Sequence, residues 1–115
     1  MFDVPAARFE ELVAEALDRI PDELGAHMEN VAVVVEEAAE DRDLFGLYEG
    51  VPLTSRGPES YAWVMPDRIT IYRRTICSVC SSEGEVVAQV RKTVVHEVAH
   101  HFGIDDRRLE ELGWA

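Results

Sequence analysis

The segment from Ser82 to Gly103 constrains the fold of this chain more than any other stretch, because both of its ends carry helix signals. Ser82, followed three residues later by Glu85, is the pattern of a capping box at a helix N-terminus. Apolar residues then recur at helical spacing up to Phe102, and Gly103 is the residue best able to adopt the left-handed conformation that ends a helix. The sequence therefore predicts a helix from 82 to about 102.

The polar side of this predicted helix carries the pattern H-E-x-x-H, at His96, Glu97 and His100. A spacing of four residues places the two imidazoles one above the other, so both can bind the same metal ion. At about 100° per residue the valines fall on the opposite arc, so these two histidines do not fill the apolar stripe. His101 projects into that stripe, and we expect it to be a core histidine or one that supports a ligand from behind.

A zinc site that performs chemistry needs three protein ligands and an open position for water. Gly103 reverses the chain, and Asp106 follows three residues later, so its carboxylate is the expected third ligand beside His96 and His100. Zinc held by such a set lowers the pKa of its bound water toward about 7. Glu97, one helical step from His96, is expected to accept the proton of that water as a general base.

These residues also have plainer interpretations. The histidines and Glu97 could lie on a solvated helix face. Either Asp105 or Asp106 could cap a short final helix, which the pattern predicts over residues 106–112. We favour Asp106 as the metal ligand and Asp105 as the cap or as a support for the ligands.

The remaining patterns predict one α+β domain over residues 1–115. Apolar residues at helical spacing, opposed by acidic ones, indicate an amphipathic helix from about Pro5 to Ile20. The β-branched run 31–35 is typical of a strand covered on both faces, whereas 67–74 alternates like a half-buried strand with Ile69 and Ile71 on one face. We further expect an acidic loop at 36–43, an edge strand with a bulge or kink at 44–53, and a mobile, turn-rich segment at 54–60.

The charge of the chain argues against nucleic acid as a partner. Asp and Glu number 23 and Lys and Arg 11, so the formal net charge is −12. Phosphate binding needs a concentrated basic face, which this composition does not favour. Residues 1–50 hold 14 acids and 3 bases, and residues 51–115 hold 9 acids and 8 bases. We therefore expect the chemistry in the nearly neutral C-terminal part.

The two cysteines and the absence of a membrane or export pattern favour a reducing cytoplasm. No apolar stretch approaches the roughly 20 residues that a membrane span requires, and the first residues lack the pattern of a signal peptide. Cys77 and Cys80 form a lone C-x-x-C. We favour two structural thiols over a redox pair or a second metal site, since no second C-x-x-C accompanies them.

Two further groups are candidates for substrate contacts. Arg73 and Arg74 could hold a substrate carboxylate, although such a pair is more often a solvated strand end. Tyr48, Tyr61 and Tyr72 are each possible oxyanion donors beside a metal, and the sequence does not rank them.

The segment around the two histidines and several other stretches of the chain resemble a known family. HEVAHHFGIDD is similar to the extended H-E-x-x-H-x-x-G-x-x-D motif of the zincin metallopeptidases, and the whole chain resembles the small bacterial zincin-like metallopeptidase family. LFGLYEGVPLTSRG, PDRITIYRR and DDRRLEELGW also match that family's pattern, so the resemblance covers most of the chain. It implies a minimal zincin: an N-terminal backing helix, a small mixed sheet, an active-site helix carrying His96, Glu97 and His100, and a short C-terminal helix, with Asp106 as third zinc ligand.

Motif and resemblance together lead us to expect a zinc-dependent metallopeptidase that acts on peptide or protein substrates, with no nucleic-acid or membrane partner. Zinc would polarise the scissile carbonyl, Glu97 would activate the water, and strand 44–51 would pair with an extended substrate along the cleft. The first alternative is a non-catalytic zinc-binding interaction or structural protein with a zincin-like fold, whose closed, four-ligand site is a structural clamp. A weaker alternative is a binding module whose acidic surface recruits a basic partner in a salt-sensitive way.

Overall fold

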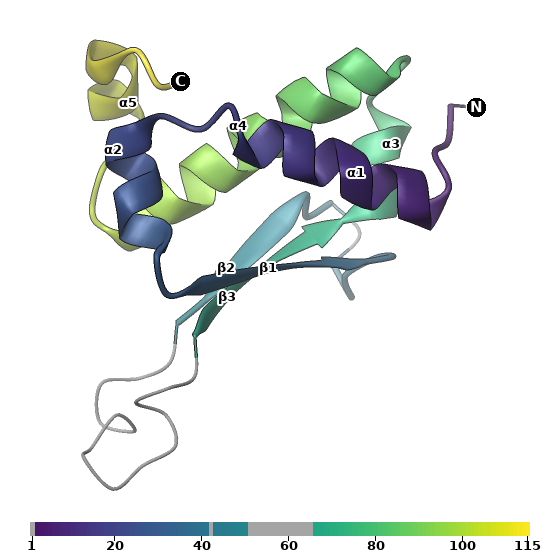
Figure 1. Ribbon diagram of the computed structural model, residues 1–115, viewed down its shortest axis with the longest axis horizontal. Coiled ribbons are helices and arrows are strands. Elements are labelled where there is room, and N and C mark those ends of the chain that lie inside the picture. The colour runs from purple at the N-terminus through teal and green to yellow at the C-terminus, as the bar shows by residue number, and fades with distance from the viewer. Residues whose placement is uncertain (1, 42, 51–65) are drawn as a thin grey trace, which may run out of the picture.

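The computed structural model describes residues 2–41, 43–50 and 66–115. In these ranges a three-stranded sheet carries the helices on one of its faces, and both described ends of the chain lie on that helical side (Figure 1). The fold is therefore α+β, as predicted. Its elements in chain order are α1 (Ala6–Leu17), α2 (Asp22–Gly25), the 3-10 helix η1 (Ala26–Met28), β1 (Val31–Glu36), β2 (Gly46–Glu49), β3 (Asp67–Tyr72), α3 (Arg73–Ser78), α4 (Glu83–His101) and α5 (Asp106–Leu112).

The sheet is mixed, as the family resemblance implies. Its strand order is β1-β3-β2, with β1 parallel and β2 antiparallel to the central β3. The expectation that β3 is half-buried was wrong, because Thr70 on its second face is only 1% exposed. Val34 and Leu47 flank Thr70 at the same register, so the neighbouring strands cover a position that alternation alone assigns to solvent.

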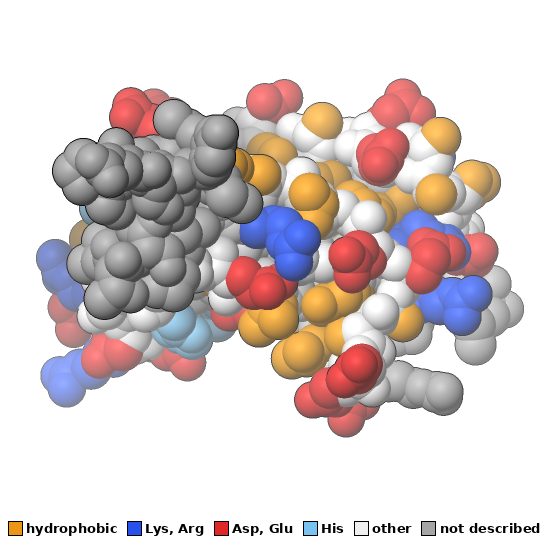
Figure 2. Space-filling model, turned by 90° about the horizontal axis from the view of Figure 1, so that it is seen from below, with side chains coloured by type: hydrophobic (Ala, Val, Ile, Leu, Met, Phe, Trp, Pro, Cys, Tyr) orange, Lys and Arg blue, Asp and Glu red, His pale blue; other side chains and the backbone are white. Residues whose placement is uncertain are grey.

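The opposite correction applies to β1, which was expected to be covered on both faces. All but the last of its residues are only partly buried, because β1 lies at an edge of the sheet and helices cover one face alone. Figure 2 shows the helix-free side of the molecule, where hydrophobic side chains lie among acidic and basic ones. Leu47 on β2 is 37% exposed there, and Arg68 pairs with Glu49 at 2.9 Å across the two strands.

The hydrophobic core lies between α1, α4 and the sheet. Phe9, Leu12 and Ala16 of α1 are almost fully buried, as the predicted amphipathic pattern requires. Helix α1 ends at Leu17, three residues before the predicted end, and the chain turns there before Pro21. The buried residues of α4 that complete this core are Val86, Val87, Val90, Val94, Val95, Val98 and Ala99.

Both ends of α4 are confirmed. The Ser82 hydroxyl oxygen accepts a hydrogen bond from the Glu85 backbone N–H at 3.1 Å. The same hydroxyl donates to the Glu85 carboxylate at 3.3 Å, so the second bond of the box joins side chains instead of reaching the Ser82 backbone. At the other end Gly103 has φ +80°, the left-handed conformation that its position predicted.

Three other expectations change or fall outside the described ranges. The third strand ends at Tyr72, and Arg73–Ser78 forms α3, although the alternation suggested a strand up to residue 74. Edge strand β2 is confirmed but has only four residues, while residues 51–53 of the predicted edge strand and the turn-rich segment 54–60 lie outside the described residues. Among the described helices, none is long and apolar enough to cross a membrane.

Candidate metal centre

Two side chains of α4 and one of α5 converge at the C-terminal end of α4. The Nε2 atom of His100 lies 2.9 Å from Oδ1 of Asp106, and Nδ1 of His96 lies 3.6 Å from the same oxygen. One ligand atom from each of the three residues falls within 4.8 Å of the others. The structure thus brings together the three residues that the sequence proposes as ligands.

The donor set and its spacing fit zinc. Ligands at about 2.0–2.1 Å from a tetrahedral zinc ion lie about 3.3–3.4 Å from one another. The two distances from the Asp106 oxygen, 2.9 and 3.6 Å, lie on either side of this value. The three side chains are 31%, 48% and 71% exposed, in the order His96, His100 and Asp106, so the cluster is accessible from solvent. Such access suits a site with an open coordination position rather than a closed structural one.

The turn between α4 and α5 fixes the position of Asp106. After Gly103 the Ile104 backbone N–H bonds back to the Ala99 carbonyl at 2.8 Å. The Asp105 carboxylate then caps α5 by accepting from the Arg108 backbone N–H at 2.9 Å, as we expected of this residue. Leu109, which is 0% exposed, anchors α5 in the core. The reversal therefore points Asp106 back at the histidines.

Glu97 is the most buried acidic side chain of the site. Burial raises its pKa above the ordinary carboxyl value, while His100, His96 and a hydrogen bond from the Tyr48 backbone N–H oppose that shift. The bond from Tyr48 ties the carboxylate to strand β2. Glu97 is therefore held in one place, in an environment that favours proton uptake.

The backbone of β2 presents alternate residues to this site. Phe45 O accepts from Tyr72 N at 2.9 Å, so the ladder with β3 continues through Leu47 and Glu49. The N–H and C=O groups of Gly46 and Tyr48 therefore face the other edge of β2, where Glu97 takes the Tyr48 N–H. This edge pairs with no strand in the described part of the chain.

Gly46 allows β2 to lie close to α4. A Cβ atom at this position would lie 2.8 Å from Cγ2 of Thr93 and 3.0 Å from the Thr70 backbone oxygen. Both distances are shorter than normal packing allows. A residue without a side chain is therefore required for the approach that joins Tyr48 to Glu97.

A cleft of about 350 Å³ runs along α4 beside β2 and the residues before it. It contains His96, Glu97 and His100 at one end and residues of the preceding α4 turns at the other. Our sequence reasoning missed the residues of those turns. The signal that could have found them is helical spacing, since Lys92 precedes His96 by four residues. The other lining residues include Gln89, Thr93, Asp43 and Phe45.

His101 does not fill the core, which was one of the two roles expected of it. Its ring stacks on Tyr48 at a centroid distance of 3.9 Å, and its side chain is 38% exposed. Its Nε2 atom lies 3.9 Å from Oδ2 of Asp67, which accepts a hydrogen bond from the Tyr48 hydroxyl at 2.7 Å. The residue is the last of α4, where the neighbouring surface is the end of β2 and not the α1 face. His101 therefore joins the end of α4 to the sheet.

The two candidate oxyanion donors that the structure describes, Tyr48 and Tyr72, do not present their hydroxyls to the metal cluster. The Tyr48 hydroxyl donates to Asp67, and its backbone N–H, not its hydroxyl, reaches Glu97. Tyr72 is 6% exposed at the end of β3 and does not line the cleft. Tyr61 lies outside the described residues.

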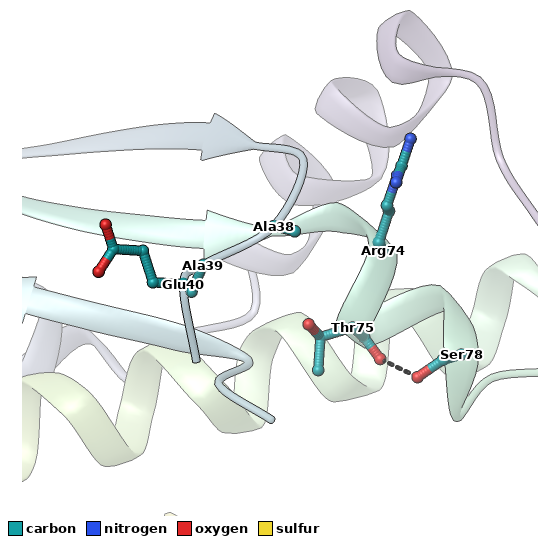
Figure 3. Close-up of a pocket in the computed structure, with 6 residues that line it drawn as sticks. All are labelled: Ala38, Ala39, Glu40, Arg74, Thr75 and Ser78. Carbon is teal, nitrogen blue, oxygen red and sulfur yellow. Dashed lines mark hydrogen bonds between the residues drawn. The ribbon is translucent and has the colours of Figure 1, made fainter. Parts of the chain in front are cut away.

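Arg73 and Arg74 do not line the cleft either. Arg73 is buried and bonds Glu37 at 2.6 Å, Asp3 at 2.7 Å and the Val4 carbonyl at 2.7 Å, which raises the pKa of its guanidinium. Arg74 lines a separate cavity of about 510 Å³ with Thr75 and Ser78 of α3, and in Figure 3 its side chain points away from both. Neither arginine is therefore placed to hold a substrate at the metal cluster.

The two cysteines are buried, 3% and 7% exposed for Cys77 and Cys80. Burial raises the pKa of both thiols, which makes them poor nucleophiles. Among the described residues they belong to no cluster that could hold a metal. These observations support the interpretation as structural thiols.

Comparisons with known proteins agree with this geometry. No curated protein matches the chain. Among solved structures, a conserved hypothetical protein from Thermus thermophilus is similar in fold, with 21% identity, a TM-score of 0.56, and coverage of 93% of this chain and 95% of that one. The family profile described as zincin-like metallopeptidase matches residues 28–114, which span β1 to α5 and include the whole cluster. The chain therefore belongs to the zincin-like metallopeptidase family.

Proposed function

We propose that this protein is a zinc-dependent metallopeptidase that hydrolyses peptide bonds. The observation that carries the proposal is the convergence of His96, His100 and Asp106 on one point, with Glu97 beside them in an open cleft. Two imidazoles and one carboxylate are a common ligand set of catalytic zinc sites. When bound, zinc polarises a carbonyl oxygen and lowers the pKa of water.

Glu97 acts as the general base in this proposal. Its carboxylate takes a proton from the attacking water and later gives it to the leaving amine. Burial raises the pKa of Glu97, which makes the carboxylate a stronger base for the first of these steps. The carboxylate lines the cleft and accepts a hydrogen bond from the Tyr48 backbone N–H.

Strand β2 binds the substrate chain in this proposal. Its outer edge, which pairs with no strand among the described residues, offers backbone groups of Gly46, and an extended peptide can add to such an edge as a further strand. Antiparallel addition is the commoner pairing and slightly the more stable one. The scissile carbonyl then comes to lie beside Glu97.

The test is Glu97→Gln, because glutamine keeps the shape of glutamate but cannot take the proton. We expect the variant to retain one zinc per chain and to lose about 10²–10⁴-fold in the rate of peptide hydrolysis. Metal analysis and digestion of a peptide library, read by mass spectrometry, measure the two quantities.

The matched control is Glu110→Gln on the exposed side of α5, which removes the same charge and leaves hydrolysis unchanged. Unaltered hydrolysis in Glu97→Gln, or a wild-type protein without zinc, would refute the proposal. Bound zinc without hydrolysis by the wild type would instead indicate the structural role.

A further inference from the structure

Lys92 has a place in the cleft that the chemistry described so far does not use. It lies on α4 four residues before His96, so the two side chains share one helix face. Four residues of helix rise about 6 Å, which puts Lys92 one turn from the metal cluster. Lys92 is exposed and lines the same cleft as His96 and Glu97.

The ammonium group of Lys92 has no partner among the described residues. Most described Lys and Arg side chains of this acidic protein bond a carboxylate or a backbone carbonyl. The exceptions are Lys92 and Arg74, and only Lys92 lines the cleft. Asp43 also lines the cleft but makes no ion pair with Lys92.

The neighbouring polar groups on α4 are already bonded to each other. The Thr93 hydroxyl donates to the Gln89 backbone carbonyl at 2.8 Å, and the Gln89 amide donates to that hydroxyl oxygen at 3.2 Å. Among the described residues that line this part of the cleft, Lys92 is therefore the charged donor that remains available to a bound molecule.

The direction of β2 assigns Lys92 to one side of the substrate. Strand β2 and helix α4 run the same way, with Gly46 beside Thr93, Tyr48 beside Glu97 and Gly50 beside His101. A peptide added antiparallel to β2 has its C-terminal part at the Gly46 end, where Lys92 lies. Two extended residues span about 7 Å, close to the rise from His96 to Lys92.

We propose that Lys92 is a specificity-determining residue that binds a substrate carboxylate about two residues beyond the scissile bond, on its C-terminal side. The carboxylate comes from an acidic side chain or from the C-terminus of a short peptide. This inference rests on the proposed function, because it uses the metal cluster to position the peptide.

The probes are three hydroxamates, whose metal-binding group fixes their position without any cleavage. In each, a succinyl unit replaces the first residue after the scissile bond. The second residue is Glu amide, Gln amide or Gln with a free carboxyl, so the set separates a side-chain carboxylate from a terminal one. Affinity for the zinc-loaded full chain is measured by calorimetry at low and high salt.

We expect at least one of the two carboxylate compounds to bind about 3–10-fold more tightly than Gln amide, and salt to reduce the difference. Lys92→Gln should abolish the preference and Lys92→Glu should reverse it. The matched control is Arg74→Gln, which removes a cation that lies outside the cleft and has no salt bridge to a described residue, and it should keep the preference.

Equal binding of all three compounds to the wild type overturns the role of Lys92 and leaves the proposed function standing. A preference that persists in Lys92→Gln overturns it as well. If the chain holds no zinc and binds none of the hydroxamates, the proposed function fails, and the inference drawn from it fails with it.

Discussion

Two adjacent aspartates show how one peptide step separates different roles. Asp105 accepts from the Arg108 backbone N–H and starts α5, whereas Asp106 points at His100 and His96. The two side chains are chemically identical, and the turn after Gly103 alone decides which one faces the histidines. At the scale of the residue, position in the backbone therefore determines chemistry.

These two roles predict that Asp106→Ala loses zinc affinity, whereas Asp105→Ala loses folding stability. Asp106→Ala removes a proposed ligand, so we expect zinc affinity to fall at least 10-fold with little change in the stability of the metal-free chain. Asp105→Ala removes a helix cap and should lower the free energy of unfolding by about 1 kcal/mol while zinc still binds. A competition titration with a chelator and urea unfolding measure the two effects. Equal zinc affinity in both variants would exclude Asp106 as a ligand.

At the scale of the element, the contact between β2 and α4 assembles the site. Helix α4 carries His96, Glu97 and His100, but the hydrogen bond that holds Glu97 comes from β2. Gly46 permits this approach, and the stack of His101 on Tyr48 joins the same two elements at their other end. Neither element by itself therefore contains the complete arrangement.

Gly46→Ala should weaken this contact. The added methyl group meets Thr93 and the Thr70 backbone oxygen, so we expect the free energy of unfolding to fall by about 1–3 kcal/mol. Hydrolysis should also slow, because Tyr48 moves away from Glu97. The control Gly84→Ala, in the first turn of α4, places its methyl group 3.9 Å from the Ser82 hydroxyl oxygen, an ordinary van der Waals contact, and should leave stability equal or higher. Urea unfolding measures the stability of both variants. A Gly46→Ala variant as stable as the wild type would show that the close approach is not required.

At the scale of the whole molecule, Arg73 connects parts of the chain that are far apart in sequence. Its guanidinium bonds Asp3 and the Val4 carbonyl near the N-terminus and Glu37 just after β1. Helix α3 begins at Arg73, directly after the central strand. One buried cation thus holds the N-terminal segment, the exit of β1 and the start of α3 together.

This network gives stability a defined dependence on pH. Hydrogen bonds from Arg73 hold the pKa of Glu37 below its ordinary value of 4.5, so the folded state binds the Glu37 proton less readily than the unfolded state does. The interaction of Glu37 with Arg73 therefore contributes fully to folding stability above pH 4.5. This contribution is lost as the pH falls through the lower, folded-state pKa.

We therefore expect Glu37→Gln to reduce the free energy of unfolding at pH 7, with a difference from wild type that shrinks below about pH 4.5. Urea unfolding at a series of pH values measures this. Glu10→Gln, which alters an exposed carboxylate without an ion pair to any described residue, provides the comparison of equal charge. A difference that stays constant from pH 7 to pH 3 would contradict the expected role of Glu37.

Patterns within one element predicted much of the fold, and contacts between elements account for the errors. Helix α4 was predicted from Ser82 and Gly103 because capping is a local interaction. Burial of Thr70 was not predicted, because it depends on the two strands that flank β3. His101 was misplaced for the same reason, since helical phase does not reveal that the neighbouring surface is Tyr48.

The sequence by itself determined which residues can bind a metal and in what order they follow one another, because helical spacing and a glycine turn act over a few residues. Only the tertiary structure decided how the rest of the site is built. The Tyr48 N–H that holds Glu97 and the cleft that contains Lys92 arise where β2 lies against α4. These elements are more than 30 residues apart in the chain, so their contact depends on packing in the folded core rather than on any local pattern.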